Sequence, residues 1–143
     1  MKIRTIIVED ERLARKEMHS LLSAFPQIEI IDEATNVSEG IAKVEEHKPD
    51  LIFLDINMPA NKTGFDLLEV LDYTPKVIFT TAHDEYAIKA FEVNALDYLL
   101  KPIEEDRLKE AIEKLESLLQ SERGSEMNVG EKKLKANDKV FVK

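Results

Sequence analysis

The sequence predicts an α/β protein in which an open, parallel, five-stranded sheet carries helices on both faces, as a three-layer αβα sandwich. Five short apolar or β-branched runs alternate along the chain with five segments whose apolar residues recur at helical spacing, a pattern typical of parallel sheets. The central run, residues 51–54, contains four apolar residues in succession, which favours a strand buried on both faces. Right-handed crossovers then limit the topology to the doubly wound type.

The composition is that of a globular chain with its own core. With 143 residues, 43% of them hydrophobic and 34% charged, the chain is long enough for one ordinary domain without disulfides. Cysteine is absent, which excludes zinc–thiolate sites and cysteine nucleophiles. No apolar run approaches the ~18 residues needed to span a bilayer, and the N-terminal apolar run is too short for a signal peptide. We therefore expect a cytoplasmic protein with no membrane partner.

The first half of the chain predicts two strands and two helices before the central strand. We expect strands over residues 5–8 and 28–31, with a helix between them that Pro26 closes. Apolar residues at helical spacing mark that helix: Leu13, Met18, Leu21, Leu22 and Phe25. Asn36 or Ser38 can cap the second helix. Its inner face carries Ile41, Ala42 and Val44.

The second half predicts three more helices and two more strands. The central strand ends before Pro59, which cannot donate to a ladder, and Thr63 can cap the third helix. We expect strands over residues 77–80 and 97–100, with a fourth helix that Asp84 opens and that ends near Asn94. The fourth helix carries Tyr86, Ala87, Ala90 and Phe91. A fifth helix runs from about residue 104 to residue 120, with Leu108, Ile112, Leu115 and Leu119 facing inward.

A change in composition near residue 121 predicts a domain boundary. The whole chain has a net charge of −9, and this negative charge disfavours nucleic-acid binding by the bulk of the chain. Residues 121–143 differ, because they contain six Lys/Arg and only four Asp/Glu. We expect one domain over residues 1–120 and a linker over residues 121–137. Residues 138–143 alternate like a strand that belongs to a second domain, since one strand cannot bury itself. A tail strand that docks on the first domain is the alternative.

Polar side chains gather where the predicted strands end. Asp55 closes the central strand, Glu9 and Asp10 follow the first, Thr80 and Thr81 end the fourth, and Lys101 follows the fifth. Ligands of open α/β sheets bind at this edge. Clustered carboxylates repel one another unless a cation neutralises them, and their hard oxygens favour Mg²⁺ over zinc or copper. A carboxylate nucleophile beside Mg²⁺, lysine and threonine suits the formation of an aspartyl-phosphate.

Each of these residues also has a structural explanation. Asp55 can cap a turn, and the acidic residues 9–11 can form a solvated helix start. Lys101 can be a surface lysine and Thr81 a strand-end cap. Their joint placement at the strand ends favours the functional interpretation.

Four motifs resemble the receiver domain of bacterial two-component response regulators, over roughly residues 3–120. They are the acidic run of residues 8–11, residues 54–59 around Asp55, Thr81-Ala82, and residues 98–102 with Lys101-Pro102. Residues 11–15 and 85–102 are similar to the LytTR (LytR/AlgR) branch, whose output is a mostly β DNA-binding domain. Residues 137–143 resemble the first strand of such a domain, so the resemblance implies transcription regulation through a C-terminal domain of which this chain holds only the start.

The resemblance implies a flavodoxin-like fold and a role for each matching residue. Asp55 accepts phosphate from a sensor histidine kinase, while Thr81 and Lys101 contact the phosphoryl oxygens. Asp10, Asp55 and the carbonyl of Asn57 bind Mg²⁺, and Glu9 acts through a water. Tyr98 is the switch aromatic that turns inward when Thr81 moves. The face made by the fourth helix, fifth strand and fifth helix can form a homodimer, with Ala87, Ile88 and Ala95 as candidates. The Lys101–Pro102 bond is cis.

The chain departs from the family pattern at a few positions, and other functions are possible for a sheet of this kind. Glu9 stands where Asp is commoner, and Asn57 and His83 occupy positions that tune the phosphate lifetime in the family. A haloacid dehalogenase-type hydrolase would need an Asp two residues after its nucleophile, where this chain has Asn57. A nucleotide or flavin site would need a Gly-rich loop after the first strand, where the acidic turn lies instead. An inactive receiver used only for docking is a further alternative. The chain is thus expected to be a regulatory domain that catalyses only its own phosphorylation and dephosphorylation.

Overall fold

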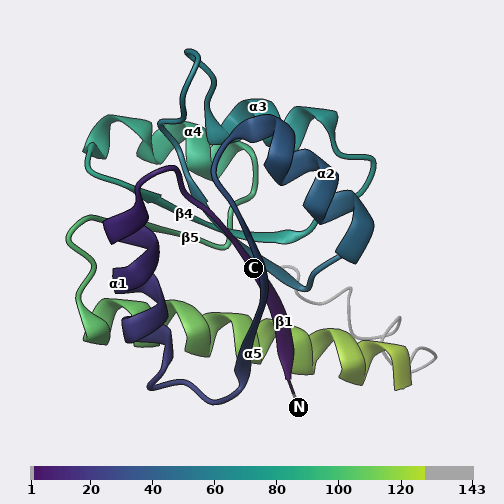
Figure 1. Cartoon of the computed structure of the whole chain (residues 1–143). Coiled ribbons are helices and arrows are strands. Elements are labelled where there is room, and N and C mark those ends of the chain that lie inside the picture. The colour runs from purple at the N-terminus through teal and green to yellow at the C-terminus, as the bar shows by residue number, and fades with distance from the viewer. Residues whose placement is uncertain (1, 128–143) are drawn as a thin grey trace. The chain divides into compact units, whose positions relative to one another are not determined.

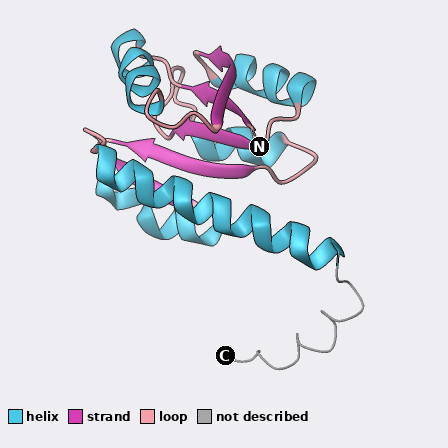
Figure 2. Cartoon of the chain, turned by 90° about the horizontal axis from the view of Figure 1, so that it is seen from below, coloured by secondary structure: helices cyan, strands magenta, loops and turns pink. Residues whose placement is uncertain are grey.

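The computed structural model describes residues 2–127, with side chains as far as residue 122. Its five strands form one parallel sheet in the order β2-β1-β3-β4-β5. Figure 2 draws the strands as neighbouring magenta arrows. The strands are β1 (Ile3–Val8), β2 (Ile28–Ala34), β3 (Leu51–Asp55), β4 (Lys76–Thr81) and β5 (Asp97–Leu100). The doubly wound fold predicted from the sequence is confirmed.

Helices cover both faces of this sheet. They are α1 (Arg12–Leu22), α2 (Val37–His47), α3 (Gly64–Val70), α4 (Ala87–Glu92) and α5 (Glu105–Met127), with a 3₁₀ turn, η1 (Asp84–Tyr86), before α4. Figure 1 shows α2, α3 and α4 together on one face and α1 on the other. The sheet and the chain as far as Ala111 form one compact unit, and the rest of α5 belongs to a second. No helix of residues 2–127 is both long and apolar enough to cross a bilayer.

The central strand is fully enclosed, as its unbroken apolar run predicts. All five residues of β3 are buried, and Phe53 and Leu54 are at most 1% exposed. The ring of Phe79 on β4 packs against Phe65 of α3 with centroids 4.8 Å apart. This packing places the start of α3 against β4, the strand that pairs with the end of β3.

Two predicted helix caps are confirmed, and each sets where a helix begins. The side chain of Asn36 accepts a hydrogen bond from the backbone N–H of Glu39, so Asn36 caps α2. Thr63 and Asp66 form a reciprocal capping box at the start of α3, which satisfies two backbone donors at once. The capping box therefore fixes the point at which the loop after β3 enters α3.

Several side chains expected to face inward are exposed instead. Leu13 is 73% exposed and Phe91 is 82% exposed, and Ala42 is also exposed. Ala87 is exposed too, which fits its place among the candidates for the dimer face. The stretch expected to form one fourth helix is divided into a 3₁₀ turn and a six-residue α4. So short a helix presents little inner surface, and Ala90 is the residue of α4 that is buried.

The last helix also differs from its predicted end. It continues past Gln120 through Gly124 to Met127, so the first part of the predicted linker is helical. A single glycine costs a helix only about 1 kcal/mol relative to alanine, and this segment contains no proline. The rest of the predicted linker, residues 128–137, and the predicted strand of residues 138–143 lie outside the described residues.

Candidate functional site

Asp55 is the last residue of β3 and is only 5% exposed. The next residue, Ile56, donates its backbone N–H to the Thr80 carbonyl at 3.1 Å and accepts from Gly64 N–H at 2.8 Å. A Cβ atom on Gly64 would lie 2.8 Å from the Asp55 carbonyl oxygen. The start of α3 therefore rests directly on the backbone of Asp55, and Gly64 is a site residue that the sequence reasoning missed.

Three carboxylates converge at this edge, as the sequence predicts. Oxygen atoms of Glu9, Asp10 and Asp55 all lie within 4.8 Å of one another. The topology causes this convergence, because β1 and β3 are neighbours and Val8 pairs with Leu54. Glu9 is 4% exposed, whereas Asp10 is open to solvent. The cluster consists of hard oxygen donors, which fits a divalent cation such as Mg²⁺.

Both oxygens of the Glu9 carboxylate already have partners. Oε1 accepts from the Lys101 ammonium at 2.7 Å, and Oε2 accepts from the backbone N–H of Glu11 at 3.1 Å. The same ammonium lies 3.7 Å from Asp55 Oδ2. Burial lowers the pKa of Lys101, but the hydrogen bond with Glu9 and the charge of Asp55 outweigh it, so this pKa is raised above its usual value.

The electrostatics of Asp55 reflect burial first and crowding second. Burial and then the negative charge of Glu9 raise the pKa of Asp55 to about 7, although Lys101 opposes the shift. Removing a carboxylate from water disfavours its charged form, and a neighbouring carboxylate adds to that effect. A cation bound among the three acids would relieve both costs.

Thr81 and Tyr98 lie on β4 and β5, and both contact His83. Thr81 is fully buried, and its hydroxyl oxygen accepts a hydrogen bond from the His83 N–H at 3.1 Å. Tyr98 donates its hydroxyl to the His83 carbonyl. One residue thus joins the two side chains expected to act as a switch. The Lys101–Pro102 bond that follows β5 is cis, as the resemblance implies.

Asn57 is exposed, and its side-chain oxygen accepts a hydrogen bond from the Tyr86 hydroxyl at 3.1 Å. The sequence predicts Tyr86 only as one of the apolar residues of the fourth helix, so this contact is new. The role of the Asn57 carbonyl as a metal ligand stays a prediction.

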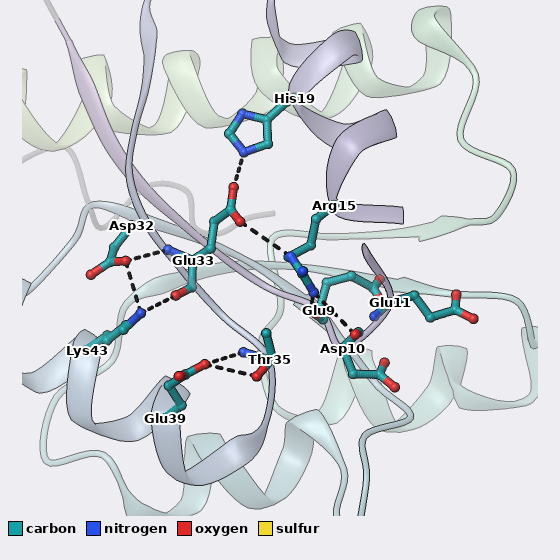
Figure 3. A network of polar contacts seen from close by, with 10 residues as sticks. All are labelled: Glu9, Asp10, Glu11, Arg15, His19, Asp32, Glu33, Thr35, Glu39 and Lys43. Atoms are coloured by element: carbon teal, nitrogen blue, oxygen red, sulfur yellow. Dashed lines mark hydrogen bonds and ion pairs between the residues drawn. The ribbon is translucent and has the colours of Figure 1, made fainter. Parts of the chain in front are cut away.

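Arg15 is another site residue that periodicity did not single out. Figure 3 shows its side chain reaching from α1 to the acidic turn that follows β1. One guanidinium nitrogen donates to the carbonyls of Glu9 at 3.0 Å and Asp10 at 3.2 Å. The only signal in the sequence is the segment 11–15 itself, which carries the resemblance to the LytTR branch.

Comparison with known proteins agrees with this geometry. The model of the response regulator receiver domain matches residues 5–113. The chain is 47% identical over 112 residues to the sensory transduction protein LytT of Enterococcus faecalis, covering 76% of this chain and 46% of that protein. It is 48% identical over 115 residues to the transcriptional regulatory protein BtsR of Salmonella typhi, covering 79% of this chain and 48% of that protein. The chain therefore spans about half the length of these curated relatives.

A solved structure extends the comparison to three dimensions. The response regulatory domain of protein mrkE from Klebsiella pneumoniae superposes with a TM-score of 0.74 at 34% sequence identity. The match covers 83% of this chain and 99% of that domain. The likeness thus extends over the whole of that domain.

Proposed function

This chain belongs to the response regulator receiver domain family, in its LytTR branch, and from that premise we propose that Asp55 accepts a phosphoryl group from a sensor histidine kinase. One observation carries the proposal. A buried carboxylate ends the central strand, with two further carboxylates within 4.8 Å of it and an ammonium at 3.7 Å. Such a domain regulates and does not turn over a substrate as a classical enzyme does.

The chemical step is an exchange of one phosphorus bond for another. An Asp55 oxygen attacks the phosphorus of a phosphohistidine, and the O–P bond forms as the P–N bond breaks. The leaving imidazole keeps the electron pair and takes up a proton. The Lys101 ammonium attracts the phosphoryl oxygens. The Thr81 hydroxyl accepts from His83, so its own O–H stays available to donate to one of those oxygens.

Asp10, Asp55 and the Asn57 carbonyl would hold Mg²⁺. Glu9 would act through a water, because both of its carboxylate oxygens already accept hydrogen bonds. When bound, Mg²⁺ would neutralise the charge that the incoming phosphoryl group adds to the acidic cluster.

The conformational response would pass through His83. A phosphoryl group adds about two negative charges and competes for the Thr81 hydroxyl. Movement of Thr81 toward the phosphoryl group would lengthen the hydrogen bond that the His83 N–H donates to the Thr81 hydroxyl. The Tyr98 hydroxyl donates to the carbonyl of His83. Tyr98 would therefore respond to a change at Thr81 without contact with the phosphate.

The test is the intact mass of the protein after incubation with phosphoramidate, which carries a P–N bond like that of phosphohistidine. We expect a gain of one phosphoryl group with Mg²⁺, no gain with EDTA, and no gain in Asp55→Asn. Asp72→Asn, in which the replaced side chain is 78% exposed, should label like the parent protein. Labelling of Asp55→Asn would contradict the assignment of the acceptor. No labelling of the parent, despite bound Mg²⁺, would favour a receiver that serves only as a docking surface.

We also propose that phosphorylation promotes a homodimer through α4, β5 and α5. Ile88 and Phe91 of α4 are 75% and 82% exposed, and Leu100 of β5 is 47% exposed. In sedimentation velocity, Phe91→Ser should stay monomeric after phosphoramidate treatment while the parent protein dimerises. Leu13→Ser, which alters an apolar residue of α1 that is 73% exposed, should dimerise like the parent. Dimerisation of Phe91→Ser to the same extent would contradict the proposal.

The output we propose is control of transcription through a DNA-binding domain that follows residue 137. The relative BtsR is named as a transcriptional regulatory protein, and this chain matches about half of its length. A mobility-shift assay with a protein that carries this receiver and such an output domain tests the proposal. A DNA affinity that is the same with and without phosphorylation of Asp55 would contradict the proposal.

A further inference from the structure

The side chain of Arg15 links three parts of the fold near the acidic cluster. It belongs to the first turn of α1 and donates back to the Glu9 and Asp10 carbonyls at 3.0 and 3.2 Å. Its Nε lies 3.4 Å from Glu33 Oε1, on the neighbouring strand β2. Figure 3 shows the guanidinium between Glu33 and the turn. Arg15 is only 18% exposed in its side chain, so it is held within this arrangement.

The turn that Arg15 contacts is strongly acidic. It carries three successive carboxylates, Glu9, Asp10 and Glu11. The first two lie within 4.8 Å of the Asp55 carboxylate, and like charges this near repel one another. Glu11, at the N-cap position of α1, makes no side-chain capping bond. Arg15 therefore supplies a side-chain anchor for the backbone on either side of Asp10.

The guanidinium is itself fixed on its far side. Glu33 also contacts His19 through Oε2 and offers its backbone carbonyl to Lys43 at 2.6 Å. Lys43 pairs in turn with Asp32 at 3.1 Å. This network ties α1 and α2 to the edge strand β2 (Figure 3). A planar guanidinium can donate to two carbonyls and a carboxylate at once, whereas an ammonium offers a single nitrogen.

We propose that Arg15 is a positioning residue for the metal site: it fixes the Glu9–Asp10 backbone and so holds the Asp10 carboxylate beside Asp55. This inference rests on the proposed function, since it assumes that Mg²⁺ binds these carboxylates. Partners that orient metal ligands commonly change metal affinity by about 10- to 100-fold when they are removed.

The sign of the effect separates positioning from simple charge. Arg15 is a cation near an acidic cluster, so its charge alone opposes Mg²⁺ binding. If only charge mattered, Arg15→Gln would bind Mg²⁺ more tightly and Arg15→Lys would be unchanged. Positioning predicts the opposite: Arg15→Gln binds about 10- to 100-fold more weakly, and Arg15→Lys weakens binding by a smaller factor.

The experiment is a titration of the whole ¹⁵N-labelled chain with MgCl₂. The dissociation constant for Mg²⁺ is measured from the NMR shifts of the amides of residues 9–11 and 55–57. Spectra without metal establish that each variant is folded, and Arg15→Lys keeps the test possible if Arg15→Gln does not fold. His19→Gln is the matched control, because it removes the other side-chain partner of Glu33 without touching the turn, and we expect parental affinity.

The possible results are distinct. Equal or tighter Mg²⁺ binding by Arg15→Gln, with normal binding by the parent, overturns the role of Arg15 and leaves the proposed function intact. Failure of the parent chain itself to bind Mg²⁺ overturns the proposed metal site and this inference with it. Weaker binding by both Arg15 variants, with His19→Gln unchanged, supports the inference.

Discussion

The Tyr86 hydroxyl donates a hydrogen bond of 3.1 Å to the side-chain oxygen of Asn57. Tyr86 ends the 3₁₀ turn before α4, and Asn57 lies two residues beyond Asp55. The bond therefore joins the segment between β4 and α4 to the loop that follows the proposed phosphoacceptor. The Tyr86 ring is also held by packing, with its centroid 6.2 Å from that of Phe65 and 6.4 Å from that of His83.

Loss of this hydroxyl should shorten the lifetime of the phosphorylated protein. Tyr86→Phe keeps the ring contacts and frees the Asn57 side chain, which we expect to open the path of water to Asp55. A hydrogen bond contributes about 0.5–1.5 kcal/mol, which corresponds to roughly 2- to 10-fold faster phosphate loss. The decrease of the phosphorylated mass peak over time measures the rate of phosphate loss. An unchanged or longer half-life would show that the bond does not restrict hydrolysis.

A second tyrosine provides a control and a prediction of its own. The Tyr73 hydroxyl is buried with no hydrogen-bond partner in the described part of the chain. Lys48 Nζ lies 4.7 Å from its ring centroid, a contact that phenylalanine keeps. Tyr73→Phe should raise the free energy of unfolding by about 1 kcal/mol, since it removes an unsatisfied buried group, and should leave the phosphate lifetime unchanged. Urea unfolding measures the stability, and a lower urea midpoint would reveal a hidden partner.

The Glu9–Lys101 ion pair should behave as a unit. Lys101→Met leaves the Glu9 carboxylate, which is 4% exposed, without its ammonium, and should cost about 2–3 kcal/mol of unfolding free energy. Adding Glu9→Gln to Lys101→Met should recover at least half of that loss, because the neutral amide needs no ammonium beside it. Urea unfolding of the parent, both single variants and the double variant measures the coupling. A double variant as unstable as Lys101→Met would place the cost outside this pair.

Without a divalent cation, Asp55 should make the protein less stable as the pH rises from about 4 to about 7. Its pKa is raised from 3.8 to about 7 in the folded chain, so in this window the folded state holds a proton that the unfolded state has lost. Stability then falls with increasing pH. Urea unfolding in EDTA across this range should show the decline in the parent protein and a smaller one in Asp55→Asn. Equal slopes in the two proteins would contradict a raised pKa.

The fold and the acidic cluster could be predicted because both follow from patterns local in sequence. An unbroken apolar run identifies a strand buried on both faces, and parallel strands bring their carboxyl ends to one edge, so Glu9, Asp10 and Asp55 had to meet. Side-chain direction on short helices could not be predicted in this way. Phe91 has helical spacing, yet α4 has only six residues and leaves it in solvent.

The contacts of Arg15 and Tyr86 could not be predicted from the sequence, for a different reason. Each joins a side chain to a group on another loop, and no periodicity encodes such a pairing. Gly64 is similar, because the need for glycine there comes from the Asp55 backbone that packs against it. The end of α5 was misjudged because composition distinguishes a polar helix poorly from a polar linker.

The bond between Glu9 and Lys101 spans 92 positions of the chain, and this separation bears on when the domain becomes competent. Contacts so distant in sequence form late, since the entropy of closing the intervening loop must be overcome first. A growing or partly folded chain that has paired β1 with β2 still lacks both Asp55 and Lys101 at the edge of the sheet. The residues of the proposed acceptor site therefore come together only after the chain has folded as far as β5.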